Sequence, residues 1–149
     1  MNWVPGAFSI IRRSALESVG YFDERFFLYY EEVDLCLRVK KAGYQIRYWP
    51  DVVVLHLGGE SSKTVGTLRF SSTGSQLTLW QMRSVFLYYR KHHGSTAWLA
   101  KEIERLWHWS RARKNGTGAK ATDSETFQRL LDQAWQETAG GRVSPPRPW

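Results

Sequence analysis

The sequence predicts an α/β fold in which short strands and helices alternate over the first half of the chain, followed by helices alone. Short strands are expected at residues 7–11, 45–49 and 52–57, which lie beside Pro, Gly or Asp; the first and the last of these are mainly apolar. The run 52–57 is continuous enough for a strand that is covered on both faces. Residues 31–42 and 76–93 carry apolar side chains at helical spacing. The 149 residues suffice for one domain with a core.

Signals for helix starts and ends support these assignments. Ser14 predicts the start of a short helix that Gly20 ends. In the helix 31–42, Asp34 and Arg38 lie four residues apart and can pair on one face. The expected buried stripe of that helix consists of Leu35, Val39 and Ala42.

The second half is predicted to be helical throughout. Its first helix has a stripe made of Leu79, Met82, Phe86 and Tyr89. Two more helices are expected at 96–113 and 124–138. The Gly-, Ser- and Thr-rich segment 58–75 is expected to be a loop, and the Pro-rich segment 140–149 a frayed tail.

Composition limits the class of partner. The chain has 21 Lys and Arg against 14 Asp and Glu, a net charge of +7, which favours an anionic partner such as a phosphate, a nucleotide, nucleic acid or an acidic membrane surface. No recognised nucleic-acid motif is present, so nucleic acid is not expected. A single cysteine, Cys36, excludes an internal disulfide framework and fits a reducing compartment. The sequence shows neither a signal peptide nor an apolar run of membrane-spanning length, so a cytoplasmic location is expected.

An acidic cluster is the most informative motif. Glu31, Glu32 and Asp34 fall within four positions, directly after the aromatic run 26–30. Such clusters bind cations or accept protons, because burying them for packing alone costs desolvation. They also occur in the first turn of a helix, where the helix dipole favours acids. The cluster alone leaves both interpretations open.

In their order along the chain, several motifs resemble the C-terminal half of bacterial family 2 glycosyltransferases of the rhamnosyltransferase-like kind. The resemblance covers about residues 3–94. The main motifs are Trp3-Val4-Pro5-Gly6-Ala7-Phe8, Val19-Gly20-Tyr21-Phe22-Asp23-Glu24, Tyr30-Glu31-Glu32-Val33-Asp34-Leu35-Cys36-Leu37-Arg38, Val54-Leu55-His56-Leu57-Gly58-Gly59 and Arg90-Lys91-His92-His93-Gly94.

The resemblance implies the C-terminal portion of a GT-A fold followed by C-terminal helices. Such enzymes transfer a sugar, with inversion, from a nucleotide-diphosphate sugar to a glycan or lipid-linked acceptor. Their nucleotide-binding half carries an Asp-x-Asp motif that holds Mg²⁺ or Mn²⁺ on the donor diphosphate. This chain contains no Asp-x-Asp. We therefore expect it to be a fragment that is inactive alone, with the main metal ligands outside it.

The resemblance also assigns roles to single residues. It places the acceptor site around Gly6 and Ala7, where small side chains let a sugar approach the backbone. Trp3 and Arg38 are expected to bind the acceptor as well. The family's acidic pair, usually Glu-Asp, falls on Glu31 and Glu32. Its second member, here Glu32, is the expected general base, and it is one methylene longer than the usual Asp.

Two further roles follow from the same comparison. Asp34 is expected to support the acidic pair by pairing with Arg38. His56 stands at the end of an apolar run before two glycines, where some family members place a ligand to the metal or the diphosphate. The alternative for His56 is a strand-end histidine bonded to the backbone.

The expected organisation has three parts. Residues 1–75 form the acceptor-binding and catalytic half, residues 76–114 an amphipathic helical extension, and residues 115–149 a linker, a last helix and a flexible tail. Tryptophans and cations in the extension are typical of a peripheral helix on the inner face of the cell membrane. The same stripe could instead pack against a donor-half chain or a second copy. The alternative function is a non-catalytic basic binding module or a pseudoenzyme subunit.

Overall fold

The computed structural model describes residues 1–56, 64–65, 68–69, 75–115 and 119–147. Its elements, in chain order, are α1 (Arg13–Val19), α2 (Glu31–Lys41), β1 (Thr64–Val65), β2 (Leu68–Arg69), α4 (Ser75–His93), the 3-10 turn η1 (Gly94–Thr96), α5 (Ala97–Asn115) and α6 (Ala119–Glu137). The strands β1 and β2 pair antiparallel, with Thr64 opposite Arg69 and Val65 opposite Leu68.

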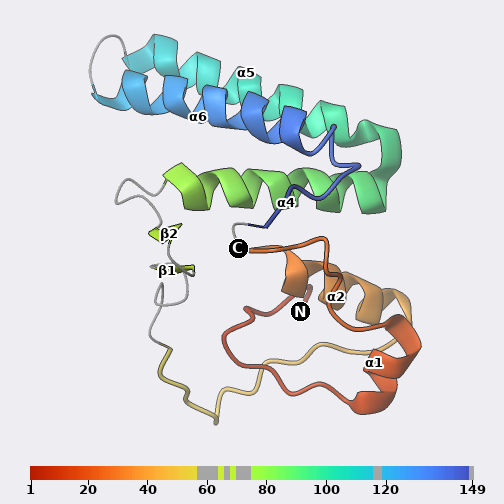
Figure 1. Cartoon of the computed structure of the whole chain (residues 1–149). Helices are drawn as coiled ribbons and strands as arrows, with labels where there is room; N and C mark the ends of the chain where they lie inside the picture. Colours follow the sequence, from red (N-terminus) through yellow and green to blue (C-terminus); the bar gives the residue numbers. More distant parts are fainter. Residues whose placement is uncertain (57–63, 66–67, 70–74, 116–118, 148–149) are drawn as a thin grey trace.

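Helix α4 divides the molecule into two parts (Figure 1). Helices α5 and α6 lie side by side on one side of α4, and α6 contacts both α4 and α5 more extensively than those two contact each other. Helices α1 and α2 and the extended N-terminal segments lie on the other side of α4. The helical second half therefore faces the segment that carries the acidic cluster.

The main core lies between α4 and α6. Leu79, Met82 and Phe86 of α4 are buried against Leu131 and Ala134 of α6. This confirms the stripe predicted for the first helix of the second half, although its fourth member, Tyr89, is only half-buried. Burial of such side chains stabilises the fold by roughly 1.5–3 kcal/mol each.

The segment after α6 was expected to fray, but residues 138–147 pack back along α4. Thr138 is fully buried and its hydroxyl donates to the Ala134 carbonyl at 2.7 Å. Gly141, at φ 81°, lies so close to α4 that an added Cβ would stand 2.1 Å from the Phe86 carbonyl oxygen. Farther on, Ser144 donates to the Arg25 carbonyl at 2.8 Å. The tail thereby ties α4 to the loop before α2.

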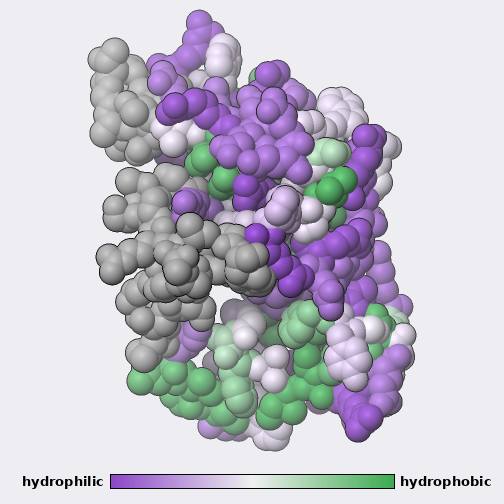
Figure 2. All heavy atoms as spheres, viewed as in Figure 1, coloured by the Kyte–Doolittle hydropathy of each residue, from purple (hydrophilic) through white to green (hydrophobic). Residues whose placement is uncertain are grey.

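The predicted α/β character of the first half is not confirmed. Residues 7–11, 45–49 and 52–56, expected as strands, form none in the described part of the chain, and Leu57 lies outside that part. A strand is stabilised by a hydrogen-bonded neighbour and by covered faces. In the segment 52–56 the faces are open, since Val53 is 93% and Leu55 87% exposed, and the sheet that the structure describes pairs only β1 with β2. Figure 2 shows the resulting apolar surface at the lower edge of the molecule, over the extended segment seen there in Figure 1.

Candidate functional site

The candidate site begins with a strained turn that leads into α2. Tyr29 and Tyr30 both have left-handed backbone conformations, at φ 67° and 69°. Such conformations cost a non-glycine residue of the order of 1 kcal/mol or more and cluster at functional sites. The ring of Tyr30 packs on Tyr88 of α4, with centroids 5.3 Å apart. The turn therefore fixes the direction in which α2 starts.

The acidic pair forms the first turn of α2. One carboxylate oxygen of Glu31 and one of Glu32, Oε2 in each case, are buried and have no hydrogen-bond partner within the described part of the chain. Burial raises the pKa of Glu31, and the charge of Glu32 raises it further, against the effect of a backbone hydrogen bond at Glu31 itself. A buried carboxylate oxygen without a partner is costly, and a substrate hydroxyl could satisfy it.

The predicted acceptor segment lies against this pair. A Cβ built on Gly6 would stand 3.7 Å from the Cβ of Glu32 and 3.9 Å from its Cγ. The backbone at Gly6 thus runs beside the Glu32 side chain, although the two are 26 positions apart. Ala7 and Trp3 are exposed in the same segment. The structure therefore brings together the small-residue segment and the expected general base.

Asp34 connects α2, which carries the acidic pair, to α4. Its side chain is fully buried and accepts from Arg38 Nε at 2.8 Å, Lys91 Nζ at 2.6 Å and His92 Nε2 at 2.7 Å. Burial pushes the pKa of Asp34 up, but the hydrogen bonds from Lys91, His92 and Arg38 outweigh it, so this pKa is lowered. The predicted pair between Asp34 and Arg38 is confirmed, and α4 supplies two further partners.

Arg38 and Lys91 extend this network toward the loop after α1. The guanidinium of Arg38 donates to the carbonyls of Val19, Gly20 and Tyr21 at 2.6, 3.0 and 2.7 Å. Lys91 Nζ also lies 2.8 Å from a carboxylate oxygen of Asp23. Arg38 thus joins the loop after α1 to Asp34, and its predicted contact with the acceptor stays a prediction.

Sequence reasoning missed Lys91, His92 and Tyr30. The motif from Arg90 to Gly94 was part of the resemblance, but it carried no assigned role, because an ion pair between residues 57 positions apart leaves no local pattern. Burial raises the pKa of the Tyr30 phenol, and the nearby Tyr89, Tyr88, Glu104 and Glu32 add to this effect. Tyr30 therefore belongs to the same environment as the acidic pair.

The surroundings of His56 differ from those of the acidic pair and Asp34. It is exposed, at the end of the described N-terminal segment, and Leu57 to Gly59 of its motif lie outside the described residues. Within the described ranges, no group of three or more His, Cys, Asp or Glu side chains is arranged to hold a metal ion. The residues described thus do not fit a Mg²⁺ or Mn²⁺ site, and the role of His56 stays a prediction.

Comparison with known proteins identifies the family. Residues 1–101 match the family described as Glycosyl transferase family group 2. The chain belongs to this family. The match covers the whole candidate site, including the α4 residues that bind Asp34.

Three relatives are named as rhamnosyltransferases. The N-acetylglucosaminyl-diphospho-decaprenol L-rhamnosyltransferase of Mycobacterium tuberculosis is 48% identical over 56 residues, which are 38% of this chain and 18% of the relative. Rhamnosyltransferase WbbL of Escherichia coli is 30% identical over 88 residues, 59% of this chain and 30% of the relative. The dTDP-rhamnosyl transferase RfbF of Shigella flexneri is 26% identical over 85 residues, which are 57% of this chain and 29% of the relative.

The chain thus spans less than a third of the length of these relatives. No solved structure gives a significant match. Of the helices that the structure describes, none combines the length and the apolar character needed to cross a bilayer.

Proposed function

We propose that this chain forms the acceptor-side part of an inverting glycosyltransferase. It would act in moving a hexosyl residue of the rhamnosyl type from a nucleotide-diphosphate sugar to a glycan or lipid-linked acceptor. The observation that carries the proposal is the acidic pair beside the Gly6 segment, where Glu31 and Glu32 each keep one buried oxygen without a protein partner in the described residues. The family relation and the names of the relatives support the reaction class and both substrates.

In this proposal Glu32 is the general base. Its carboxylate accepts the proton of the acceptor hydroxyl while that oxygen attacks the anomeric carbon of the donor sugar. The bond from that carbon to the diphosphate oxygen breaks on the opposite face, and its electron pair leaves with the diphosphate. A base must be ionised at the working pH, and the start of α2 favours a carboxylate. The choice of Glu32 over Glu31 follows the family resemblance, in which the second acid of the pair is the base, and is supported by the position of Glu32 beside Gly6.

The remaining site residues take supporting roles. Gly6, Ala7 and Trp3 are proposed to line the acceptor, while Asp34 and Arg38 hold the start of α2 in place. The donor diphosphate would bring Mg²⁺ or Mn²⁺, as the family relation implies. Because the described residues form no site for such an ion, we assign no reaction step to it, and His56 is proposed only as a contact of the donor side.

Helix α5 is proposed to lie on an anionic membrane surface, where a lipid-linked acceptor would be presented. Trp98, Trp107 and Trp109 are each at least half exposed. Two of these rings carry a guanidinium at 4.5 Å, from Arg111 and Arg113 respectively. Exposed indole rings next to cations are typical of interfacial helices. The same surface could instead cover a second protein chain, and the vesicle experiment in the Discussion separates the two.

The test is an assay of rhamnosyl transfer from dTDP-rhamnose to an N-acetylglucosaminyl-diphospho-lipid. The protein assayed carries this chain joined to a nucleotide-binding half, and the chain alone is expected to be inactive. Glu32→Gln should lower turnover by roughly 100- to 10,000-fold, as expected for loss of a general base. If Glu31→Gln abolished turnover while Glu32→Gln kept it, the base would be Glu31. Full turnover in both variants would favour a non-catalytic binding module.

A further inference from the structure

A cavity of about 450 Å³ lies between α4 and α5, beyond the acidic pair. Its size falls within the range of about 300–1,000 Å³ that is usual for small-molecule sites. The floor includes Phe86 of α4 and Leu131 of α6, which belong to the core. The α5 side is formed by Leu99 and Ile103, which remain 46% and 59% exposed. A ligand in the cavity would cover apolar surface that the fold itself leaves open.

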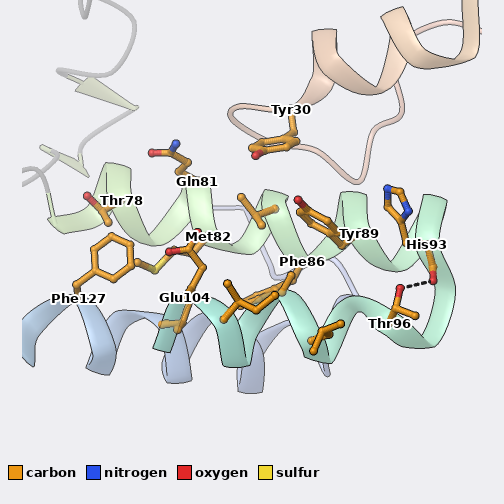
Figure 3. A pocket seen from close by; sticks show the side chains of 15 residues that line it. Tyr30, Thr78, Gln81, Met82, Phe86, Tyr89, His93, Thr96, Glu104 and Phe127 are labelled. Atoms are coloured by element: carbon orange, nitrogen blue, oxygen red, sulfur yellow. Dashed lines mark hydrogen bonds between the residues drawn. The ribbon is translucent and has the colours of Figure 1, made fainter. Parts of the chain in front are cut away.

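Part of the polar lining of this cavity comes from the turn that leads into the acidic pair. Tyr30 comes from the turn before α2, Tyr89 from α4 and Glu104 from α5, so three elements contribute polar groups to the lining (Figure 3). Further polar groups of the lining are Thr78, Gln81, His93 and Thr96. Tyr30 is followed directly by Glu31, the first member of the acidic pair. Burial raises the pKa of the Tyr30 phenol and the charge of Glu32 is among the effects that raise it further, so the Tyr30 end of the cavity lies near the acidic pair.

We propose that this cavity binds the proximal hydrocarbon chain of a lipid-linked acceptor, with the isoprenoid in the cavity and the sugar at Glu32. The inference rests on the proposed function, which supplies an acceptor that joins a hydrocarbon chain to a sugar. The apolar floor and wall fit the hydrocarbon, and Tyr30 marks the end of the cavity from which the sugar would reach the base.

The proposed membrane surface continues into this cavity. Leu99, Ile103 and Leu106 follow one another at helical spacing on α5, and the first two line the cavity while Leu106 does not. Trp98 and Trp107 stand beside this stripe in sequence and are half exposed. A lipid chain could thus pass from the bilayer along α5 into the cavity without crossing a charged barrier on this stripe.

The test is isothermal titration of farnesyl phosphate, below its micelle concentration, into the 149-residue chain. Saturable binding is expected for the natural chain. Ile103→Ser should weaken it tenfold or more, because the buried apolar contact is lost. Leu106→Ser is the matched control, since Leu106 is also 59% exposed on the same helix but lies outside the cavity lining. It should change affinity less than twofold.

Further measurements separate the explanations. Leu99→Ser should weaken binding as Ile103→Ser does, and unchanged melting temperatures would show that all variants fold. Equal weakening by Ile103→Ser and Leu106→Ser would indicate partition onto the surface of α5 and overturn the proposal, as would the absence of saturable binding. Transfer to a soluble glycan without farnesyl phosphate binding would leave the proposed function standing alone. Farnesyl phosphate binding without any transfer would support the cavity and contradict the proposed function.

Discussion

Replacing Asp34 by Asn tests whether the buried ion-pair network holds the acidic pair in place. Asp34 is fully buried, and its two oxygens accept from Arg38, Lys91 and His92 at 2.6–2.8 Å. Asparagine keeps the shape but removes the charge. It also turns one acceptor into a donor that faces cationic groups.

The expected cost follows from this burial. Removing one partner of a buried ion pair destabilises a protein by about 3–5 kcal/mol. For a chain of this size, each kcal/mol lowers the melting temperature by about 2–4 °C, so Asp34→Asn should lower it by roughly 6–20 °C. Thermal unfolding followed by circular dichroism at pH 7 measures this shift.

The matched control is Glu17→Gln. Glu17 pairs with Arg13 at 2.8 Å, also four residues apart, but the two side chains are 53% and 86% exposed. An exposed pair contributes less than about 1 kcal/mol, so this variant should melt near the natural chain. Equal melting temperatures for the two variants would refute the reasoning.

The same network gives a pH dependence. Because the pKa of Asp34 is lowered in the folded state, its stabilising effect is present above the ordinary aspartate range and is lost as the pH falls through the lowered value. The difference in stability between the natural chain and Asp34→Asn should therefore shrink in strong acid. A difference that stays constant down to acid unfolding would contradict the assignment.

Two further predictions concern the donor and the membrane. In a protein completed by a nucleotide-binding half, His56→Ala should weaken donor binding and leave the melting temperature nearly unchanged, since the side chain is exposed; a large melting shift with unaltered donor affinity would make His56 structural. The chain should co-sediment with anionic but not neutral vesicles and lose this binding at high salt or when Trp98, Trp107 and Trp109 are all replaced by Ala. A well-folded chain that ignores anionic vesicles would favour packing against another protein.

Local patterns predicted which segments are helical but not every boundary, since α1 begins at Arg13 without a side-chain cap and α6 begins at Ala119, inside the expected linker. The start of α2 at Glu31 and its pairing of Asp34 with Arg38 follow from contacts within one helix, so spacing alone reveals them. The strands expected at 7–11, 45–49 and 52–57 depend on neighbours elsewhere in a sheet, which spacing along the chain cannot reveal. The packed tail was missed for a related reason, since Gly141 reads as a flexible residue until its approach to α4 is known.

The candidate site was likewise predicted only in part from the sequence. The family resemblance located Glu31, Glu32 and the Gly6 segment, and the structure places Gly6 beside Glu32. The resemblance could not identify Lys91 or His92 as partners of Asp34, because these contacts join two helices that are far apart in sequence. Nor does sequence reveal the left-handed turn at Tyr30, which only the backbone geometry shows.

The most direct test of the account is chemical rescue of the proposed base. In the completed enzyme, Glu32→Ala should lose most of its turnover, and added formate should restore part of it by accepting the acceptor proton in the space left by the side chain. Glu31→Ala should not respond to formate. Rescue of Glu31→Ala but not of Glu32→Ala would contradict the central claim that Glu32 removes the proton of the attacking hydroxyl.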